Sequence, residues 1–113
     1  MKQNIKLSVS NLINEEKNSI LNLENSIQEY LKCDFGVVCT SSGTASIHLS
    51  LILSNVKEGD EVICQTSTFA ATAFPILYQK AIPIFIDSEN DTWNICPDLL
   101  EETIKNRISK GKK

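Results

Sequence analysis

The sequence is poor in histidine and aromatic residues and has no long apolar run. No stretch approaches the roughly 18 consecutive apolar residues of a membrane-spanning helix, so we predict no membrane segment. The N-terminal stretch MKQNIKLSVSNLINEEKN is interrupted by charged side chains and does not resemble a signal peptide. A cytoplasmic protein is therefore expected. The net charge of -3 argues against nucleic acid as the main partner.

Recognisable metal-binding motifs are also missing. The chain has a single histidine, His48, and its four cysteines include no CxxC pair. Zinc sites need cysteine or histidine ligands at short, characteristic spacings, so we predict no metal site. Three of the cysteines adjoin apolar, strand-like runs, where a free thiol behaves as a small hydrophobic group. We expect buried thiols at Cys33, Cys39, Cys64 and Cys96.

The spacing of apolar residues predicts alternating helices and strands, without internal repeats. One helix followed by three strand–helix pairs is typical of an α/β domain with a largely parallel sheet. Three short strands make a thin sheet with an open edge, so the sequence looks like part of a larger sheet. The expected elements are a helix over 14–32, strands over 35–40 and 81–87, a Gly-Asp turn and a short strand within 57–64, and helices after Thr44, over 70–80 and from Pro97.

A small polar turn, SSGT at 41–44, separates the first expected strand from the next helix. The free N–H groups and the dipole of a helix N-terminus favour phosphate at such a turn. Gly43 permits close approach of the backbone, and Ser42 and Thr44 add hydroxyl groups. The alternative is that Ser42 only caps the helix, as serine commonly does. The turn matches neither GxxxxGK[ST] nor GxGxxG, so these nucleotide-binding motifs do not apply.

Several ordered motifs place this turn in a wider pattern over roughly residues 35–104. They are the SSGTAS turn, the GDEVI strand, the STFAAT loop, the strand end PIFID and the stretch DTWNICPDLL. In this order they resemble the DegT/DnrJ/EryC1/StrS family of pyridoxal-phosphate-dependent sugar aminotransferases. The resemblance implies a partial three-layer α/β domain of the aspartate aminotransferase-like kind (fold type I), with an incomplete sheet. Residues 1–34 would form an N-terminal segment and helix, and residues 35–113 the first part of the large cofactor-binding domain.

Within the family, the chain is most similar to enzymes that make 4-amino sugars from nucleotide-linked 4-keto-6-deoxy sugars. The resemblance therefore implies pyridoxal phosphate as cofactor, a nucleotide-sugar substrate and an amino donor. It also implies a homodimer or pairing with a longer relative, because active sites of the family form between two subunits.

The resemblance assigns cofactor contacts to four residues. Ser42, Gly43 and Thr44 match the turn that holds the cofactor phosphate. Phe69, in STFAAT, matches the aromatic residue that stacks on the pyridine ring, and an aromatic face suits a flat, electron-poor ring. The alternative for Phe69 is an ordinary core residue.

Other polar residues near these motifs are assigned no chemistry. Thr68 and Thr72 are expected to shape the loop around Phe69. Asp87 is interpreted as a strand-end residue, since the family's partner for the pyridine nitrogen comes from a later motif. His48 is expected to be a packed or solvated helix residue, because no catalytic partner is within reach by sequence.

The chain also departs from the family pattern. Amino transfer needs a lysine that holds the cofactor as a Schiff base, and none of the lysines stands in the family's Ser-x-x-x-x-Lys context. We therefore predict no catalytic residue and an N-terminal portion that is inactive alone. Upstream, no glycine precedes Gly36, although the family usually has one in a segment that forms the substrate entrance and a dimer contact. Two alternatives stay open: a non-catalytic partner of a full-length relative, and a small phosphate- or nucleotide-binding module.

Overall fold

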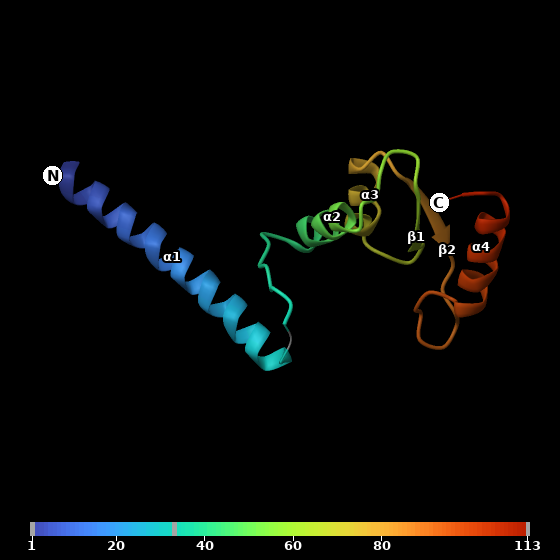
Figure 1. Ribbon diagram of the computed structural model, residues 1–113, viewed down its shortest axis with the longest axis horizontal. Helices are drawn as coiled ribbons and strands as arrows, with labels where there is room; N and C mark the ends of the chain where they lie inside the picture. Colours follow the sequence, from blue (N-terminus) through green and yellow to red (C-terminus); the bar gives the residue numbers. More distant parts are fainter. Residues whose placement is uncertain (1, 33, 113) are drawn as a thin grey trace. The chain divides into compact units, whose positions relative to one another are not determined.

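The computed structural model describes residues 2–32 and 34–112, and in the first helix the side chains of residue 15 and of residues 18 onward. The chain divides into two compact units, Met1–Cys39 and Thr40–Lys113, which are described separately below. Figure 1 labels the elements in chain order. These are α1 (Lys2–Leu31), α2 (Gly43–Leu53), β1 (Glu61–Gln65), the 3-10 helix η1 (Ala70–Thr72), α3 (Phe74–Tyr78), β2 (Ile82–Ile86) and α4 (Pro97–Ser109).

The first unit consists of helix α1 and the segment that follows it. The helix predicted over 14–32 is confirmed, but it begins much earlier, at Lys2. The sequence of residues 1–13 shows no clear apolar period. The helix nevertheless extends into this stretch, because the sequence of α1 contains neither glycine nor proline. Lys32 has a φ of 49°, a left-handed conformation that commonly ends helices.

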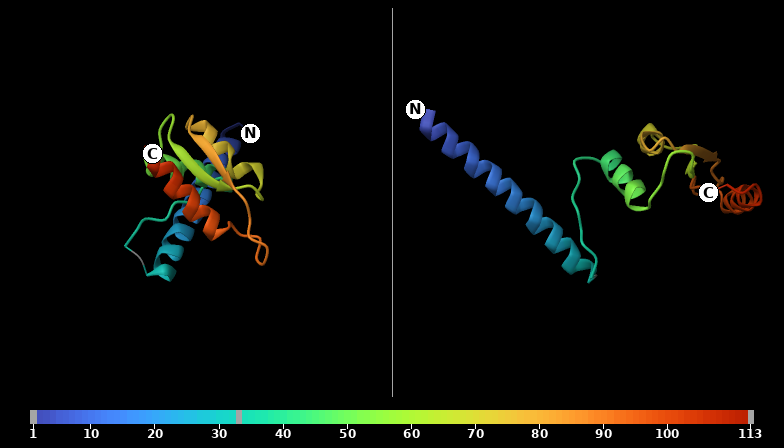
Figure 2. Two further views of the ribbon diagram at one scale, coloured as in Figure 1. Left: turned by 90° about the vertical axis from the view of Figure 1, so that its right-hand side faces the viewer. Right: turned by 45° about the horizontal axis from the view of Figure 1, so that its top comes forward.

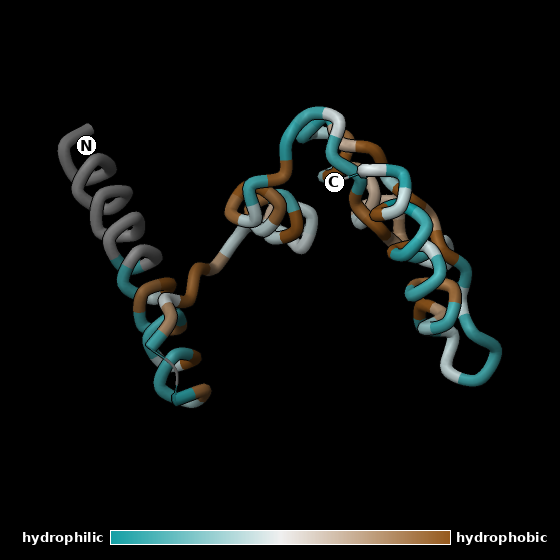
Figure 3. The backbone as a smooth tube through the Cα atoms, turned by 45° about the vertical axis from the view of Figure 1, so that its right-hand side comes forward, coloured by the Kyte–Doolittle hydropathy of each residue, from teal (hydrophilic) through white to brown (hydrophobic). Residues whose placement is uncertain are grey.

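The strand predicted over 35–40 is wrong, because residues 36–40 belong to no strand. Part of the segment after α1 is apolar (brown in Figure 3), and its Val38 is 68% exposed. A strand needs a neighbouring strand for its backbone groups, and the N–H of Cys39 instead donates to Glu24 Oε1 at 2.7 Å. β-propensity alone therefore does not produce a strand here.

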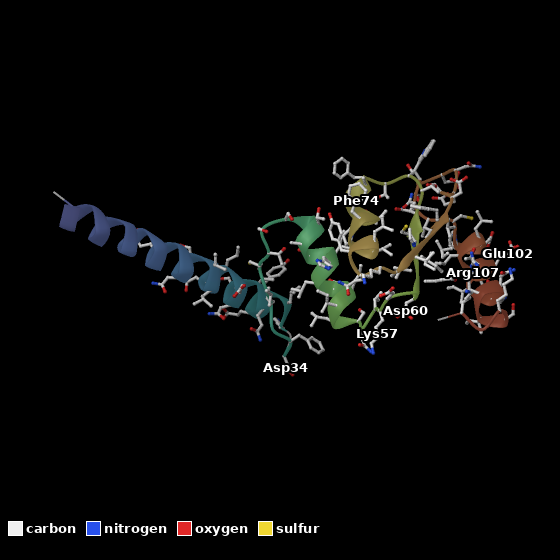
Figure 4. All side chains as sticks on the ribbon, turned by 90° about the horizontal axis from the view of Figure 1, so that it is seen from above. Asp34, Lys57, Asp60, Phe74, Glu102 and Arg107 are labelled. Atoms are coloured by element: carbon white, nitrogen blue, oxygen red, sulfur yellow. The ribbon has the colours of Figure 1, made fainter. Side chains whose placement is uncertain are left out.

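The second unit contains a two-stranded parallel sheet of β1 and β2, in which Ile63 pairs with Ile84. Both strands were predicted, and so was the turn that leads into β1. In that turn Asp60 Oδ2 accepts from the N–H of Lys57 at 2.9 Å (Figure 4), and Gly59 has a φ of 85°, which favours glycine.

Helices cover both faces of this sheet. Figures 1 and 2 show α3 and α4 on opposite sides of the two strands. Successive side chains of a strand point to opposite faces. Cys64 accordingly packs with Ile76 of α3, whereas Ile63 and Ile104 of α4 line one small cavity of about 150 Å³. Within this unit the layered α/β class is confirmed.

Helix α4 begins at Pro97, as the sequence predicts. Its Arg107 (Figure 4) reaches the first residue of β1, with Nε 3.4 Å from Glu61 Oε2. The Glu61 side chain is only 8% exposed. The ion pair therefore offsets the cost of removing this carboxylate charge from water.

A polar loop joins β2 to α4. The carboxylate of Glu89 accepts hydrogen bonds from the N–H groups of Asp91 and Thr92 and from the Thr92 hydroxyl. The side-chain amide of Gln65 donates to Ser88 Oγ at 2.7 Å and to the carbonyl of Trp93. These bonds tie the loop to the end of β1.

The Glu89 loop should lose its order in acid. The Thr92 hydroxyl, together with neighbouring backbone N–H groups, lowers the pKa of Glu89 below its ordinary value. Its stabilising contribution is therefore fully present above the ordinary glutamate pKa and is lost as the pH falls through the lower, folded value. We expect the Trp93 indole and the Thr92 amide to report this transition in an NMR titration. Glu89→Gln should remove the titration, and an unchanged titration in that variant would contradict the assignment.

Candidate cofactor-phosphate site

The turn before α2 is closed by a serine cap. Ser42 has extended backbone angles, and its Oγ accepts the N–H of Ala45 at 3.2 Å. The first N–H groups of a helix have no partner within the helix, so those of Gly43 and Thr44 are available at its positive end. The capping interpretation of Ser42 is therefore confirmed. The cap would not compete with a phosphate site, because Ser42 bonds the N–H of Ala45 and leaves those of Gly43 and Thr44 available.

Two further hydroxyl groups brace this turn. Thr40 Oγ1 donates to the carbonyl of Ser42 at 3.0 Å and lies within hydrogen-bond distance of Ser46 Oγ. Ser46 Oγ also donates to the Ser42 carbonyl at 3.3 Å. Thr40 and Ser46 were not singled out from the sequence, since neither belongs to the four-residue turn. They fix the direction in which the turn presents its N–H groups.

Packing among the described residues does not require a glycine at position 43. A Cβ atom added at this position would meet nothing within 4 Å, and the φ of Gly43 is not in the left-handed region. A glycine that neither strain nor crowding demands leaves space in front of the helix N-terminus, where an anion could approach the backbone. The residues present therefore fit a phosphate group.

Phe69 stands next to this helix rather than in the core. It immediately precedes η1, which packs beside α2, and its side chain is 82% exposed. Within the described part of this chain, Phe69 is therefore not a core residue. Behind it, the hydroxyls of Thr68 and Thr72 lie 2.9 Å apart and close the loop.

The loop of Phe69 follows the carboxyl end of β1, and Asp87 follows the same end of β2. Thr66 Oγ1 donates to Asp87 Oδ1 at 3.2 Å, and the N–H of Ser88 donates to the same oxygen at 2.9 Å. Asp87 thus joins the two strand ends. Ligands of open parallel sheets bind at this edge, which is where the structure places Phe69.

His48 lies outside this edge. Its Nε2 is 2.6 Å from Gln79 Nε2, and its ring meets Tyr78 edge-on at a centroid distance of 5.4 Å. This contact packs α2 against the end of α3.

The cysteines are less buried than predicted. Cys64 is buried, and desolvation raises the pKa of its thiol. The prediction is wrong for Cys39 and Cys96, which are half-buried because the first lies in an irregular segment and the second precedes α4. Cys33 lies outside the described residues. In the described part of the chain, no three histidine, cysteine or acidic side chains come together as a metal site.

The described helices also lack the combination of length and apolar character needed to cross a bilayer.

Comparison with known sequences identifies long, named relatives. The putative pyridoxal phosphate-dependent aminotransferase EpsN of Bacillus subtilis (strain 168) is 53% identical over 92 residues, covering 79% of this chain and 24% of the relative. The GDP-perosamine synthase of Escherichia coli O157:H7 is 37% identical over 98 residues, covering 87% of this chain and 27% of the relative. The chain thus spans about a quarter of the length of these relatives.

Solved structures give the same result for the fold. A DegT DnrJ EryC1 StrS aminotransferase from Brucella abortus matches 98% of this chain and 31% of its own, with a TM-score of 0.78 and 25% identity. The putative sugar aminotransferase Spr1654 from Streptococcus pneumoniae, in its PLP-form, matches 74% of this chain and 21% of its own, with a TM-score of 0.68 and 34% identity. The family's cofactor is pyridoxal phosphate. Because the family profile also matches residues 2–110, the chain belongs to the DegT/DnrJ/EryC1/StrS aminotransferase family.

Proposed function

We propose that this chain is the N-terminal, phosphate-holding portion of a pyridoxal-phosphate-dependent aminotransferase. Its reaction would convert a nucleotide-linked 4-keto-6-deoxy sugar to a 4-amino sugar, with nitrogen from an amino donor, in the cytoplasm. The observation that carries the proposal is the open, braced N-terminus of α2, with an exposed Phe69 on the loop beside that helix. A relative named GDP-perosamine synthase and a solved structure titled putative sugar aminotransferase support the substrate class.

Each residue of the site has a distinct task in this proposal. The backbone N–H groups of Gly43 and Thr44 would donate to the cofactor phosphate, and the Thr44 hydroxyl would add a donor. Ser42 caps and stabilises the N-terminus of α2 by accepting the N–H of Ala45. Phe69 would present its ring face to the pyridine ring. When bound, pyridoxal phosphate supplies an electron sink for transfer of the amino group.

None of the lysines in this sequence stands in the family's Ser-x-x-x-x-Lys context, so the proposal assigns the Schiff-base role to none of them. The two lysines whose ion pairs the structure defines, Lys80 with Glu58 and Lys105 with Glu101, hold exposed surface pairs. We therefore propose that the chain is inactive alone and acts with a second polypeptide, in a homodimer or with a longer relative. In the latter case it could be a non-catalytic partner.

A second candidate function is a small phosphate- or nucleotide-binding module that works as it stands. The observation that favours it is the intact turn, which needs no other part of the chain to present its N–H groups. The two candidates differ in affinity, because a dedicated module should bind phosphate tightly.

Pyridoxal phosphate should bind weakly at α2. A helix dipole contributes about 0.3–2 kcal/mol, so we expect millimolar affinity, with NMR shifts concentrated on the amides of Gly43 and Thr44. Thr44→Ala should weaken binding of both pyridoxal phosphate and inorganic phosphate, whereas Phe69→Ala should affect only the former. Ser42→Ala should instead destabilise α2 by about 0.5–2 kcal/mol.

Ser50→Ala is the matched control for Ser42→Ala, because its hydroxyl only bonds the carbonyl of Ser46 one turn earlier. It should leave both binding and helix stability nearly unchanged. Submicromolar binding of inorganic phosphate would support the module instead, and shifts scattered away from α2 would contradict the site.

The chain alone should show no aminotransferase turnover with any amino donor. After incubation with pyridoxal phosphate, borohydride reduction and peptide mapping should find label spread over several exposed lysines. Stoichiometric label on one lysine, together with activity on a 4-keto sugar nucleotide, would overturn the inactive-portion proposal.

A further inference from the structure

Hydrogen bonds tie the carboxyl end of β1 to the end of β2, beyond the last paired residues. The N–H of Thr66 donates to the carbonyl of Ile86 at 2.9 Å. The Thr66 hydroxyl donates to Asp87 Oδ1 at 3.2 Å and also lies 3.3 Å from the Ile86 carbonyl oxygen. Asp87 is fixed in turn, because the same Oδ1 accepts the N–H of Ser88 at 2.9 Å. Thr66 is therefore held both by the backbone of β2 and by the carboxylate that follows it.

Gln65 makes a second connection from the same end of β1. Its side-chain amide nitrogen donates to Ser88 Oγ at 2.7 Å and to the carbonyl of Trp93, so both donors of the amide are used. Trp93 has a φ of 61°, a conformation that a bulky residue adopts only where its surroundings hold it. We call Gln65, Thr66 and Asp87 together the strand-end clamp.

The loop of Phe69 begins directly after this clamp. Only residues 67 and 68 separate Thr66 from Phe69, and the N–H of Thr68 donates to the Thr66 carbonyl at 3.0 Å. On its other side, the Phe69 carbonyl accepts the N–H of Thr72 at 2.9 Å. The Phe69 side chain is 82% exposed, so packing among the described residues contributes little to where its ring lies. The position of the ring therefore depends on the backbone that the clamp holds.

The phosphate turn is braced by other residues. Its bonds join Ser42 to Ala45, Thr40 and Ser46, and none of these bonds involves the strand-end clamp. Two separate sets of hydrogen bonds would thus hold the two ends of the cofactor, one set behind the phosphate and the other behind the ring. A change in the clamp should therefore affect recognition of the ring without affecting recognition of the phosphate.

We propose that the strand-end clamp positions the Phe69 ring and thereby determines how strongly the site prefers a pyridine-bearing phosphate ester to phosphate alone. Its three members are positioning residues, because they act through Phe69. Asp87, expected only as a strand-end residue, gains this task, and Gln65 and Thr66 were not singled out from the sequence. The identity of the ligand rests on the proposed function, whereas the effect of the clamp on the order of the Phe69 loop does not.

The test compares pyridoxamine 5′-phosphate with inorganic phosphate, each titrated into the full chain and followed by NMR at the amides of Gly43 and Thr44. Pyridoxamine phosphate carries the ring and the phosphate but no aldehyde, so it does not react with surface lysines. Thr66→Val removes the hydroxyl and keeps the β-branched shape. It should weaken binding of pyridoxamine phosphate by about twofold to tenfold, the effect of one hydrogen bond, and leave that of inorganic phosphate unchanged. Thr66→Ser keeps the hydroxyl and should restore the affinity.

Further variants separate positioning from a general loss of structure. Asp87→Ala should behave as Thr66→Val does, whereas Asp87→Asn keeps an acceptor oxygen and should stay close to wild type. Adding Thr66→Val to Phe69→Ala should cause no further loss, because the clamp acts through that ring. Equal weakening for both ligands, no recovery in Thr66→Ser, or additive losses in the double variant would overturn the proposal.

Backbone relaxation tests the clamp without any ligand. In the wild-type chain the amide order parameter of Phe69 should approach about 0.85, the value of rigid backbone, and Thr66→Val should lower it toward about 0.6. A wild-type value already below about 0.6 would overturn the proposal, and this measurement decides the matter if Thr66→Val does not fold. If Phe69→Ala leaves the affinity for pyridoxamine phosphate unchanged while Thr66→Val still lowers the order parameter, the clamp is upheld and the proposed function is contradicted.

Discussion

The small core between β1, α3 and β2 is the constraint on which the second unit depends. In the described part of the chain the buried apolar side chains are Cys64, Ile76, Ala81 and Ile86, and proline is buried only at Pro75. Burying one large aliphatic side chain contributes about 1.5–3 kcal/mol, against a backbone entropy cost of about 1–2 kcal/mol per ordered residue. So few buried groups leave little surplus stability.

The same core places the candidate site. Leu51, near the end of α2, packs on Cys64 and Ile76, so the helix is held against the sheet while its N-terminus stays open. α3 links this contact to η1, which packs beside α2 and positions the loop of Phe69. Weakening the core should therefore change the position of the phosphate turn relative to the Phe69 ring before it changes the local structure of either.

Local sequence signals predicted much of this arrangement, but not the contacts between separate segments. The cap at Ser42, the start of α4 at Pro97 and both paired strands follow from nearby residue types. The expected strand over 35–40 failed because a strand also needs a partner, which sequence periodicity does not reveal. The predicted burial of Cys39, which lies in the same segment, is also wrong. The contact between Thr40 and Ser46 joins residues on either side of the SSGT turn.

Thermal unfolding of the isolated chain tests the central claim most directly, namely that the chain is one part of a larger α/β aminotransferase fold. With its small core and unpaired strand edge, the monomer should unfold in a broad transition whose van't Hoff enthalpy is well below that of a complete domain of this length, or should associate. Calorimetry with light scattering on the same sample measures both. A sharp, reversible, two-state transition of a monomer would contradict the account and favour a self-sufficient binding module.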